Sequence, residues 1–400
     1  MMKKNKKILI VIGAIVFAIG VALGIFLGLA NRVYRIAIYD LPETLSSGIK
    51  KQAEGSGIKI DVSVIDGKEQ FSVSESKKYD AVITWNGAFA KSLSKLAPEI
   101  PANVYSVMPT SVRSSGMIDG KYKAVPILYD HVPIFICKSA AKNIDEDVGF
   151  ASLSELESFM ENAGEDFSFS MISAGSIDEY LYEFLSMMAE SILGGEGYKK
   201  LCDAICEKRE FREVLDDELA KSSDGKKLSL RTVMDKIFEW QSKSLIQRQW
   251  YTITQDDLFN LMQYKSFLVG SMPMDYYRNM PRRVSYSYSV FKFPPLDPDM
   301  KHGMVSNEVV MIPRSNKKPL LNLEKHLVSL NIQERLSNVT TYTVVHSQSG
   351  CFDSIADDAR FFAASTPLGP LQMLDKAAFT SAETAKKFAD DVREYLVNGI

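Results

Sequence analysis

The chain has 400 residues, more than a single hydrophobic core usually holds, so two lobes or domains are expected. Hydrophobic residues make up 46% of the chain and charged residues 24%, which is typical of a globular protein, so disorder is not the default expectation. The formal net charge is −3, and removing the four lysines of the amino-terminal head lowers it to −7. A nucleic-acid partner is therefore not expected, because such a partner needs a basic surface.

The first thirty residues predict a membrane-directed segment. The basic head MMKKNKK precedes Ile8 to Ala30, which carry no charge and would span roughly 34 Å as a helix, enough for a bilayer. The basic head predicts that the amino terminus stays in the cytoplasm and that the bulk of the chain lies outside. Two fates are open, an uncleaved membrane anchor or a signal peptide cut near Ala30, and no cysteine is placed for a lipid anchor.

The next hundred residues alternate between strand and helix patterns. Strands are expected at Val33–Asp40, Ile58–Asp66 and Ala81–Thr84, with helical stretches between and after them. This rhythm predicts a parallel sheet with helices on its faces, and ligands bind beyond the carboxyl ends of such strands. Trp85 and Asn86 follow the third strand, so they are candidates for the wall of a cleft; the alternative is a packed Trp beside a helix-capping Asn.

The stretch DGKYKAVPILYDHVPIFICKS, Asp119 to Ser139, contains two prolines and a polar Tyr-Asp-His. Proline disfavours a central strand, so a crossing between two lobes is expected here. Tyr129 and Asp130 would then face the ligand, with Asp130 accepting hydroxyl donors or pairing with an ammonium group. The alternative for Asp130 is a salt bridge within the hinge, and His131 is expected to be a neutral structural histidine.

The rest of the chain is mainly helical, with a second group of strands. Helical stripes follow Ser176, Leu230 and Thr254, and strands are expected within Lys265–Tyr277, Val284–Asp299 and the segment after His302. Two more helical regions, Leu320–Leu330 and the region after Thr380, close the chain. This order predicts three crossings between the lobes, near Leu128–Val132, Val290–Pro294 and Ile312–Asn316.

Several segments, taken in order, resemble the extracellular solute-binding proteins of ABC importers, in the maltose-binding-like family 1. YDAVITWNGAFAKSLSKLAP is similar to a strand, loop and helix that line the cleft of that family, and DGKYKAVPILYDHVPIFICKS to its first hinge. LGGEGY resembles the end of a long helix of the second lobe. ITQDDLFNLMQYKSFLVGSMPMDYY resembles its ligand loop, and VSNEVVMIPRSNKKP the strand and turn before its closing helices. Two features depart from the family, the missing lipid-modified cysteine and the Met272-Pro273-Met274 that stands where sugar binders often have a tryptophan.

The resemblance implies an α/β fold of the class II periplasmic-binding-protein type, with two lobes joined by a three-crossing hinge. The expected boundaries are 1–30 for the anchor or signal segment, 33–128 with 294–312 for lobe one, and 132–290 with 316–400 for lobe two. It also implies a binding protein that delivers a small polar ligand, a sugar or sugar derivative, to membrane-spanning ABC permease subunits. Alternatives are a membrane-tethered sensor or interaction module and a membrane-bound glycoside hydrolase.

Ligand contacts are expected from both lobes, because binding clefts combine apolar walls with a few placed polar groups. In the second lobe the candidates are Asp275, Tyr276 and Tyr277, and in the first lobe Ser306 and Asn307. Trp250 is a further candidate for stacking on a sugar, although packing is its alternative. The complete set of candidates is Trp85, Asn86, Tyr129, Asp130, Trp250, Asp275, Tyr276, Tyr277, Ser306 and Asn307.

No catalytic residue, metal site or cofactor is expected. The sequence lacks the nucleophile-elbow, P-loop and zinc-protease motifs. Cys202 and Cys206 are four residues apart on an expected helix, but no second pair of ligands accompanies them. Together with Cys137 and Cys351 they are interpreted as structural or incidental thiols.

Overall fold

The computed structural model describes residues 32–69, 71–141, 144, 149–163, 166–208 and 210–398. The expected membrane-directed segment, Ile8 to Ala30, lies outside these ranges. Among the described residues, no helix combines the length and apolar character needed to cross a membrane.

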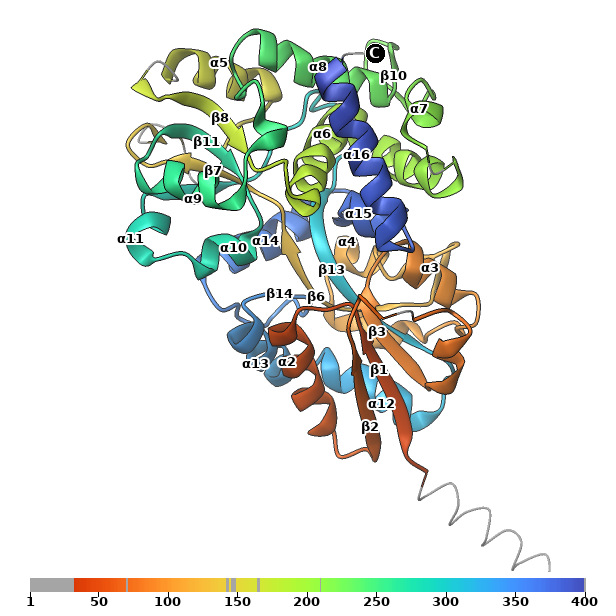
Figure 1. Cartoon of the computed structure of the whole chain (residues 1–400). Helices are drawn as coiled ribbons and strands as arrows, with labels where there is room; N and C mark the ends of the chain where they lie inside the picture. Colours follow the sequence, from red (N-terminus) through yellow and green to blue (C-terminus); the bar gives the residue numbers. More distant parts are fainter. Residues whose placement is uncertain are drawn as a thin grey trace, which may run out of the picture.

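A seven-stranded sheet forms the core of the first lobe, in the lower half of Figure 1. The strand order is β14-β6-β13-β3-β1-β2, with β15 paired to β13; β1 is parallel to β2 and β3, and β13 is antiparallel to β3 and β6. The strands are β1 (Tyr34–Tyr39), β2 (Ile60–Ile65), β3 (Ala81–Trp85), β6 (Val125–His131), β13 (Met304–Pro313), β14 (Thr343–Val344) and β15 (Pro370–Gln372).

Helices cover both faces of this sheet, and each face has its own hydrophobic cluster. The helices of this lobe are α2 (Glu43–Glu54), α3 (Ala88–Ser94), α4 (Thr110–Ser114), α12 (Lys318–Leu327), α13 (Leu330–Thr340) and α14 (Ser354–Ser365), with 3-10 turns η1 (Glu75–Lys78) and η2 (Ala102–Val107). A two-stranded ribbon of β4 (Met117–Ile118) and β5 (Lys121–Tyr122) lies beside them.

The second lobe, in the upper half of Figure 1, is built on a four-stranded sheet in the order β12-β7-β11-β8. Its strands are β7 (Ile134–Cys137), β8 (Phe169–Ser173), β11 (Phe267–Ser271) and β12 (Tyr288–Phe291), and a ribbon of β9 (Ala220–Lys221) and β10 (Lys227–Leu228) accompanies them. Its helices are α5 (Leu153–Ala163), α6 (Asp178–Lys208), α7 (Phe211–Val214), α8 (Leu230–Ser242), η5 (Trp250–Thr252), α9 (Gln255–Gln263), α10 (Met274–Asn279), α11 (Arg282–Ser285), α15 (Leu374–Ala378) and α16 (Ala382–Asn398).

The long helix α6 contains one break, at Gly194. This residue has φ of 65°, a left-handed conformation that glycine adopts without steric cost. A Cβ atom here would also lie 2.9 Å from the Cε atom of Met300. The predicted end of a helix at Gly194-Gly195 is therefore a break within α6, after which helix continues to Lys208.

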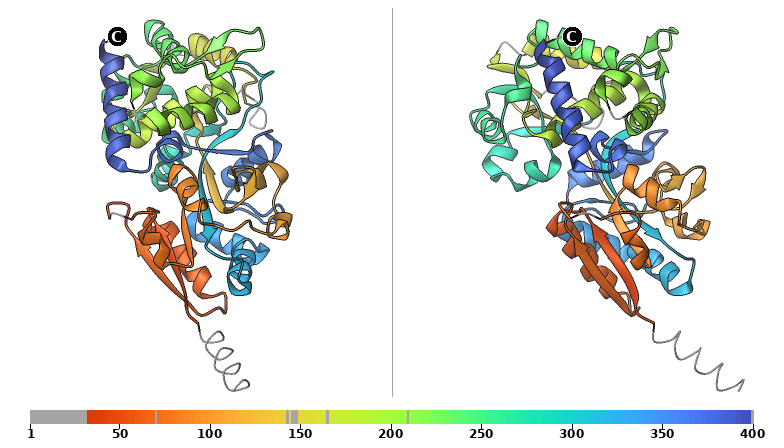
Figure 2. Two further views of the ribbon diagram at one scale, coloured as in Figure 1. Left: turned by 90° about the vertical axis from the view of Figure 1, so that its right-hand side faces the viewer. Right: turned by 45° about the vertical axis from the view of Figure 1, so that its right-hand side comes forward.

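The two lobes are joined by three connections, as expected, and Figure 2 shows the second lobe above the first from two further sides. The first connection is the short Val132-Pro133 segment between β6 and β7, close to its predicted position. The second connection runs from the end of β12 to the start of β13. The predicted position, Val290–Pro294, covers only the beginning of this connection. The third follows β15, near Met373, so the position predicted for it, Ile312–Asn316, is wrong.

The expected lobe boundaries are wrong for residues 318–372. Helices α12 and α13 contribute Leu320, Leu323 and Leu336 to the same hydrophobic cluster as β1, and β14 and β15 belong to the first sheet. The apolar spacing of these helices is visible in the sequence, but spacing alone does not say which sheet they cover. The first lobe therefore extends to about Gln372, and only α15 and α16 return to the second.

The stretch from Asp119 to Ser139 contains the expected crossing at Val132-Pro133, but most of it is strand. β6 is a fully buried central strand between β14 and β13, and it contains Pro126. Its pairing with β13 shifts register between Val309 and Val310, opposite Pro126 and Leu128. A bulge at this point accommodates the missing N–H of proline, which is why the strand tolerates it.

Candidate functional site

A cleft of about 940 Å³ lies between the two lobes. On the first lobe it begins at the carboxyl ends of the parallel strands β1, β2 and β3, where Tyr39, Ile65 and Trp85 line it. On the second lobe it is lined by the first turn of α6 and by the loop after β11. Strands β8 and β11 are parallel, so both lobes direct strand carboxyl ends toward the cleft, the usual place for ligands in such sheets.

Aromatic and apolar side chains form one part of the cleft lining. Trp85 is 9% exposed, and its ring centroid lies 6.4 Å from that of Tyr342. Phe89, Met274 and Phe379 extend this surface across both lobes. Such surfaces accept the apolar faces of a ligand, while nearby polar groups fix its orientation.

The turn after Trp85 is shaped by the close approach of α15. A Cβ atom on Gly87 would lie 2.1 Å from the carbonyl oxygen of Lys376, so only glycine fits there. The side chain of Lys376 pairs with Asp40 at 3.1 Å and lies 3.8 Å from Asp375. Burial alone lowers the pKa of Lys376, but the carboxylates of Asp375 and Asp40 outweigh it and raise the pKa. A segment of the second lobe is thereby held against the end of β1.

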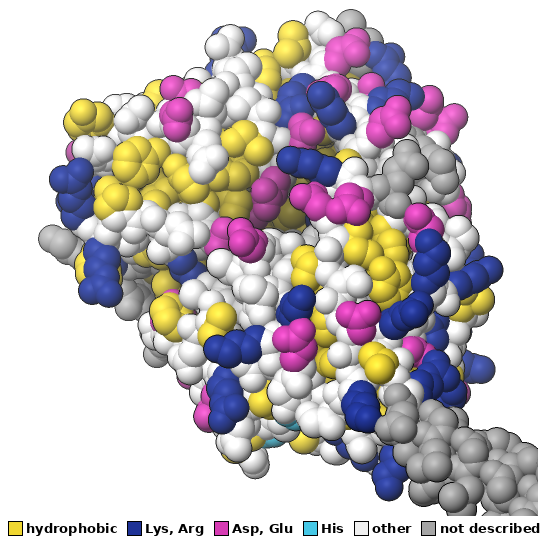
Figure 3. Space-filling model, turned by 60° about the horizontal axis from the view of Figure 1, so that its bottom comes forward, with side chains coloured by type: hydrophobic (Ala, Val, Ile, Leu, Met, Phe, Trp, Pro, Cys, Tyr) yellow, Lys and Arg dark blue, Asp and Glu magenta, His cyan; other side chains and the backbone are white. Residues whose placement is uncertain are grey.

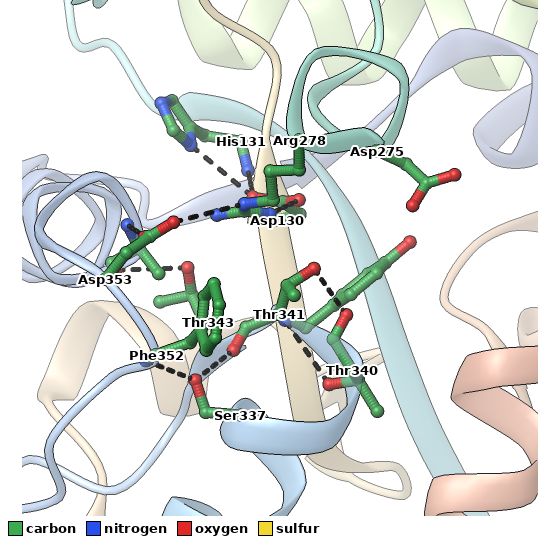
Figure 4. Close-up of polar contacts among 12 residues, drawn as sticks. Asp130, His131, Asp275, Arg278, Ser337, Thr340, Thr341, Thr343, Phe352 and Asp353 are labelled. Atoms are coloured by element: carbon green, nitrogen blue, oxygen red, sulfur yellow. Dashed lines mark hydrogen bonds and ion pairs between the residues drawn. The ribbon is translucent and has the colours of Figure 1, made fainter. Parts of the chain in front are cut away.

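Asp130 and Arg278 form a buried ion pair that joins the two lobes (Figure 4). Nη1 of Arg278, on α10, donates to Oδ2 of Asp130, at the end of β6, at 2.5 Å. Nε of Arg278 lies 3.6 Å from Asp353, the N-cap of α14, and the Asp130 side chain is only 5% exposed. Asp130 lines the cleft and is also part of the contact between the lobes.

Four of the ten candidate residues line the cleft: Trp85, Asp130, Asp275 and Asn307. They come from β3, β6, α10 and β13, so both lobes contribute. For these four, the interpretation as cleft residues agrees with the geometry. Their contact with a ligand stays a prediction.

Four other candidates are core residues. Tyr129, in β6, is fully buried, because β6 is a central strand with both faces covered. Ser306 is also fully buried, at the start of β13. Trp250 packs edge-on against Phe184 with ring centroids 4.7 Å apart, so its structural alternative is the correct one. Tyr277 packs on Phe135 and donates to the carbonyl of Ser285 at 2.9 Å.

Asn86 and Tyr276 make structural hydrogen bonds and are not part of the cleft lining. Nδ2 of Asn86 donates to the carboxylate of Glu308, which also accepts from the Ser115 hydroxyl. Burial raises the pKa of Glu308 to about 7, although these two donors lower it. The Tyr276 hydroxyl donates to the carbonyl of Gln255 at 3.2 Å.

Several cleft residues were not among the sequence candidates. They include Asp40, Glu179, Tyr342, Asp375 and Lys376. Asp40 ends the first predicted strand, so its position was a usable signal. Tyr342 belongs to a segment that the sequence analysis placed in the wrong lobe, and its approach to Trp85 has no local sequence signal.

No group of three or more His, Cys, Asp or Glu side chains among the described residues is arranged to hold a metal ion. The four cysteines are free thiols in the described structure, and Cys137 and Cys202 are buried. Burial raises the pKa of the Cys202 thiol, which keeps it unreactive. The interpretation of the cysteines as structural or incidental fits these positions.

No family model matches the chain, and no curated protein matches it. Solved structures do match. The bacterial solute receptor AcbH, described with an exclusive preference for β-D-galactopyranose, has a TM-score of 0.74 and 12% identity over 92% of this chain and 93% of its own. RafE from Streptococcus pneumoniae, in complex with raffinose, has a TM-score of 0.59 and 12% identity over 91% of this chain and 95% of its own.

Maltose-bound MalE3 of T. maritima matches with a TM-score of 0.55 and 13% identity over 91% of this chain and 94% of its own. These neighbours are binding proteins rather than enzymes. Identity this low establishes similarity of fold. The predicted fold class is confirmed: the chain has the two-lobed α/β fold of the solute-binding receptors.

Proposed function

We propose that this protein is the extracytoplasmic substrate-binding component of an ABC importer for a small polar ligand, a sugar or sugar derivative. The observation that carries the proposal is the cleft, in which the aromatic wall of Trp85 and Tyr342 faces polar groups from both lobes. The similar structures named above bind galactopyranose, raffinose and maltose. A ligand that touches both lobes stabilises their closed arrangement by its differential affinity for it.

The transport partners in this proposal are two membrane-spanning permease subunits that receive the ligand from the closed form. The uncharged segment from Ile8 to Ala30 would tether the protein to the membrane, or would be removed by cleavage near Ala30. The bulk of the chain would then work outside the cytoplasm. The protein itself would perform no chemical reaction on the ligand.

A thermal-shift screen of the full chain in mild detergent tests the proposal. The panel contains monosaccharides, oligosaccharides, polyols and amino acids. A ligand at 100 times its dissociation constant stabilises the folded state by about 2.7 kcal/mol, which raises the melting temperature measurably. A shift with a sugar supports the importer assignment, whereas no shift with any compound would contradict it and favour a tethered interaction module.

Calorimetric titration then locates the site. Asp275→Asn should weaken binding of the sugar found in the screen, because Asp275 lines the cleft from the second lobe. The matched control is Asp256→Asn, an exposed aspartate in the first turn of α9 outside the cleft. Equal affinity in both variants would remove Asp275 from the site.

A further inference from the structure

The cleft between the lobes is rich in carboxylates. Nine acidic residues line it and only three lysines do. The acidic residues are Asp40, Glu43, Asp66, Glu69, Asp130, Asp178, Glu179, Asp275 and Asp375, and the lysines are Lys50, Lys376 and Lys386. Figure 3 shows acidic side chains beside hydrophobic ones across the middle of the molecule. Because these carboxylates come from both lobes, they surround whatever the cleft holds.

Four of the carboxylates are already neutralised by a basic partner. Lys376 forms ion pairs with Asp40 and Asp375, and Arg278 forms one with Asp130. Arg393 pairs with Asp178 at 2.6 Å. These pairs fix the shape of the cleft, and they leave the remaining carboxylates to interact with a ligand.

Glu179 and Asp275 form no ion pair with any residue in the part of the chain that the structure describes. Both residues are exposed and line the cleft, and both belong to the second lobe, in α6 and α10. Desolvation by the surrounding protein raises the pKa of Glu179, and the negative charges of Asp375 and Asp275 raise it further, while the positive charge of Lys376 opposes them. A positive group placed between Glu179 and Asp275 would relieve the repulsion between these two carboxylates.

A buried polar group at the cleft wall also lacks a hydrogen-bond partner. His131 lines the cleft with a side chain only 3% exposed, and its Nδ1 makes no hydrogen bond among the described residues. The nearest charged group is Asp130, whose Oδ1 lies 3.6 Å from Nδ1, beyond hydrogen-bond distance. A hydroxyl or ammonium donor of a ligand would satisfy this nitrogen, since an unpaired buried polar group is costly.

The carboxylates suit an organic cation better than a metal ion. No three of the described His, Cys, Asp and Glu side chains are grouped closely enough for a metal. Trp85 and Tyr342 also line the cleft, and aromatic rings of this kind can stack on sugar rings and attract ammonium groups. An extended, polar and positively charged molecule matches both properties of the lining.

We propose that the ligand of this cleft is an amino sugar, or an oligosaccharide of amino sugars, that carries at least one protonated amine. This inference rests on the proposed function and narrows its ligand class. In the bound state the amine lies beside Glu179 and Asp275, and the sugar rings lie against Trp85 and Tyr342. The cleft therefore discriminates against neutral sugars of the same shape.

Calorimetric titration of the full chain with matched sugars tests the inference. Each set keeps one sugar ring and varies only the group at the second carbon, which is a hydroxyl, an acetamido or an amino group. Every set is tested as the monosaccharide and as the α- and β-linked disaccharides. Spermidine is included as an amine without a sugar. The amino form should bind at least tenfold more tightly than the other two. Its affinity should fall as ionic strength rises from about 0.01 M to about 1 M, because the Debye length shrinks from ~30 Å to ~3 Å.

Two variants connect the preference to the cleft. Glu179→Gln should remove most of the difference between the amino and hydroxyl forms. Glu196→Gln, an exposed glutamate farther along α6, should leave the difference unchanged.

Equal or tighter binding of the neutral sugars would overturn the inference and leave the proposed function standing. Binding of spermidine alone would overturn the sugar assignment as well. Binding of no member of the panel would contradict both. A preference for the amino form that survives Glu179→Gln would also refute the assigned position of the amine.

Discussion

The ion pair between Asp130 and Arg278 gives the sharpest stability prediction. Asp130→Ala removes the one carboxylate among the described residues that Nη1 of Arg278 contacts, and the Arg278 side chain is 7% exposed. Nε and Nη2 of the guanidinium already lack hydrogen-bond partners among the described residues. The substitution would leave a buried cation with one contact, to Asp353 at 3.6 Å.

The expected loss follows from this burial. Removing one partner of a buried pair costs about 3–5 kcal/mol, because the remaining charge stays desolvated. An exposed pair between the same lobes provides a comparison: Lys91 and Asp203 lie 2.9 Å apart, with side chains 52% and 61% exposed. Lys91→Ala should cost no more than about 1 kcal/mol, since solvent screens that pair.

Urea unfolding of the full chain measures both changes. The double variant Asp130→Ala with Arg278→Met should recover much of the stability lost in Asp130→Ala, because no unpaired charge is left buried. A loss below about 1 kcal/mol for Asp130→Ala would refute the reasoning and would mean that water reaches the pair. Because Asp130 carries this structural role, Asp275 and Glu179 are cleaner probes of ligand binding.

Three further predictions concern positions with close packing or buried charge. Burial raises the pKa of Glu308 in the folded state to about 7 from its ordinary value of 4.5, so its stabilising effect is complete below pH 4.5 and is lost as the pH rises through 7. Glu308→Gln should therefore be more stable than the parent at pH 8, by up to about 3 kcal/mol, and equal to it near pH 4, as urea unfolding at both pH values would reveal. Gly175→Ala should cost about 1–3 kcal/mol in the same assay, since its Cβ would lie 2.6 Å from the Trp250 ring. Gly87→Ala should lower the melting temperature by displacing Lys376, and an unchanged value would contradict the close approach of α15.

The sequence predicted the elements better than their assignment to lobes. Strands β1, β2 and β3 and the cleft at their carboxyl ends follow from alternation and from the placement of Trp85. The helices α12 and α13 were recognisable by spacing, but the sheet they cover is decided by long-range packing. The third connection was therefore predicted about 60 residues too early, because no local sequence pattern indicates where the chain returns to the second lobe.

The site was harder to predict than the fold, for reasons that differ between residues. Tyr129 was misplaced because Pro126 argued against a central strand, and the bulge in β6 that accommodates this proline is not visible in the sequence. Trp250 is of a residue type that stacks on sugars, and only its tertiary contact with Phe184 identifies it as a core residue. Lys376 reaches the cleft because α15 approaches Gly87, a contact between distant parts of the chain.

Tryptophan fluorescence tests most directly whether a sugar binds in this cleft. The chain has three tryptophans; Trp85 lines the cleft, whereas Trp240 and Trp250 are fully buried in the second lobe. Titration with a sugar that binds should change the emission in a saturable way, and Trp85→Phe should abolish that change while the melting temperature still rises at saturating sugar. An undiminished emission change in Trp85→Phe would place the ligand elsewhere and contradict the account.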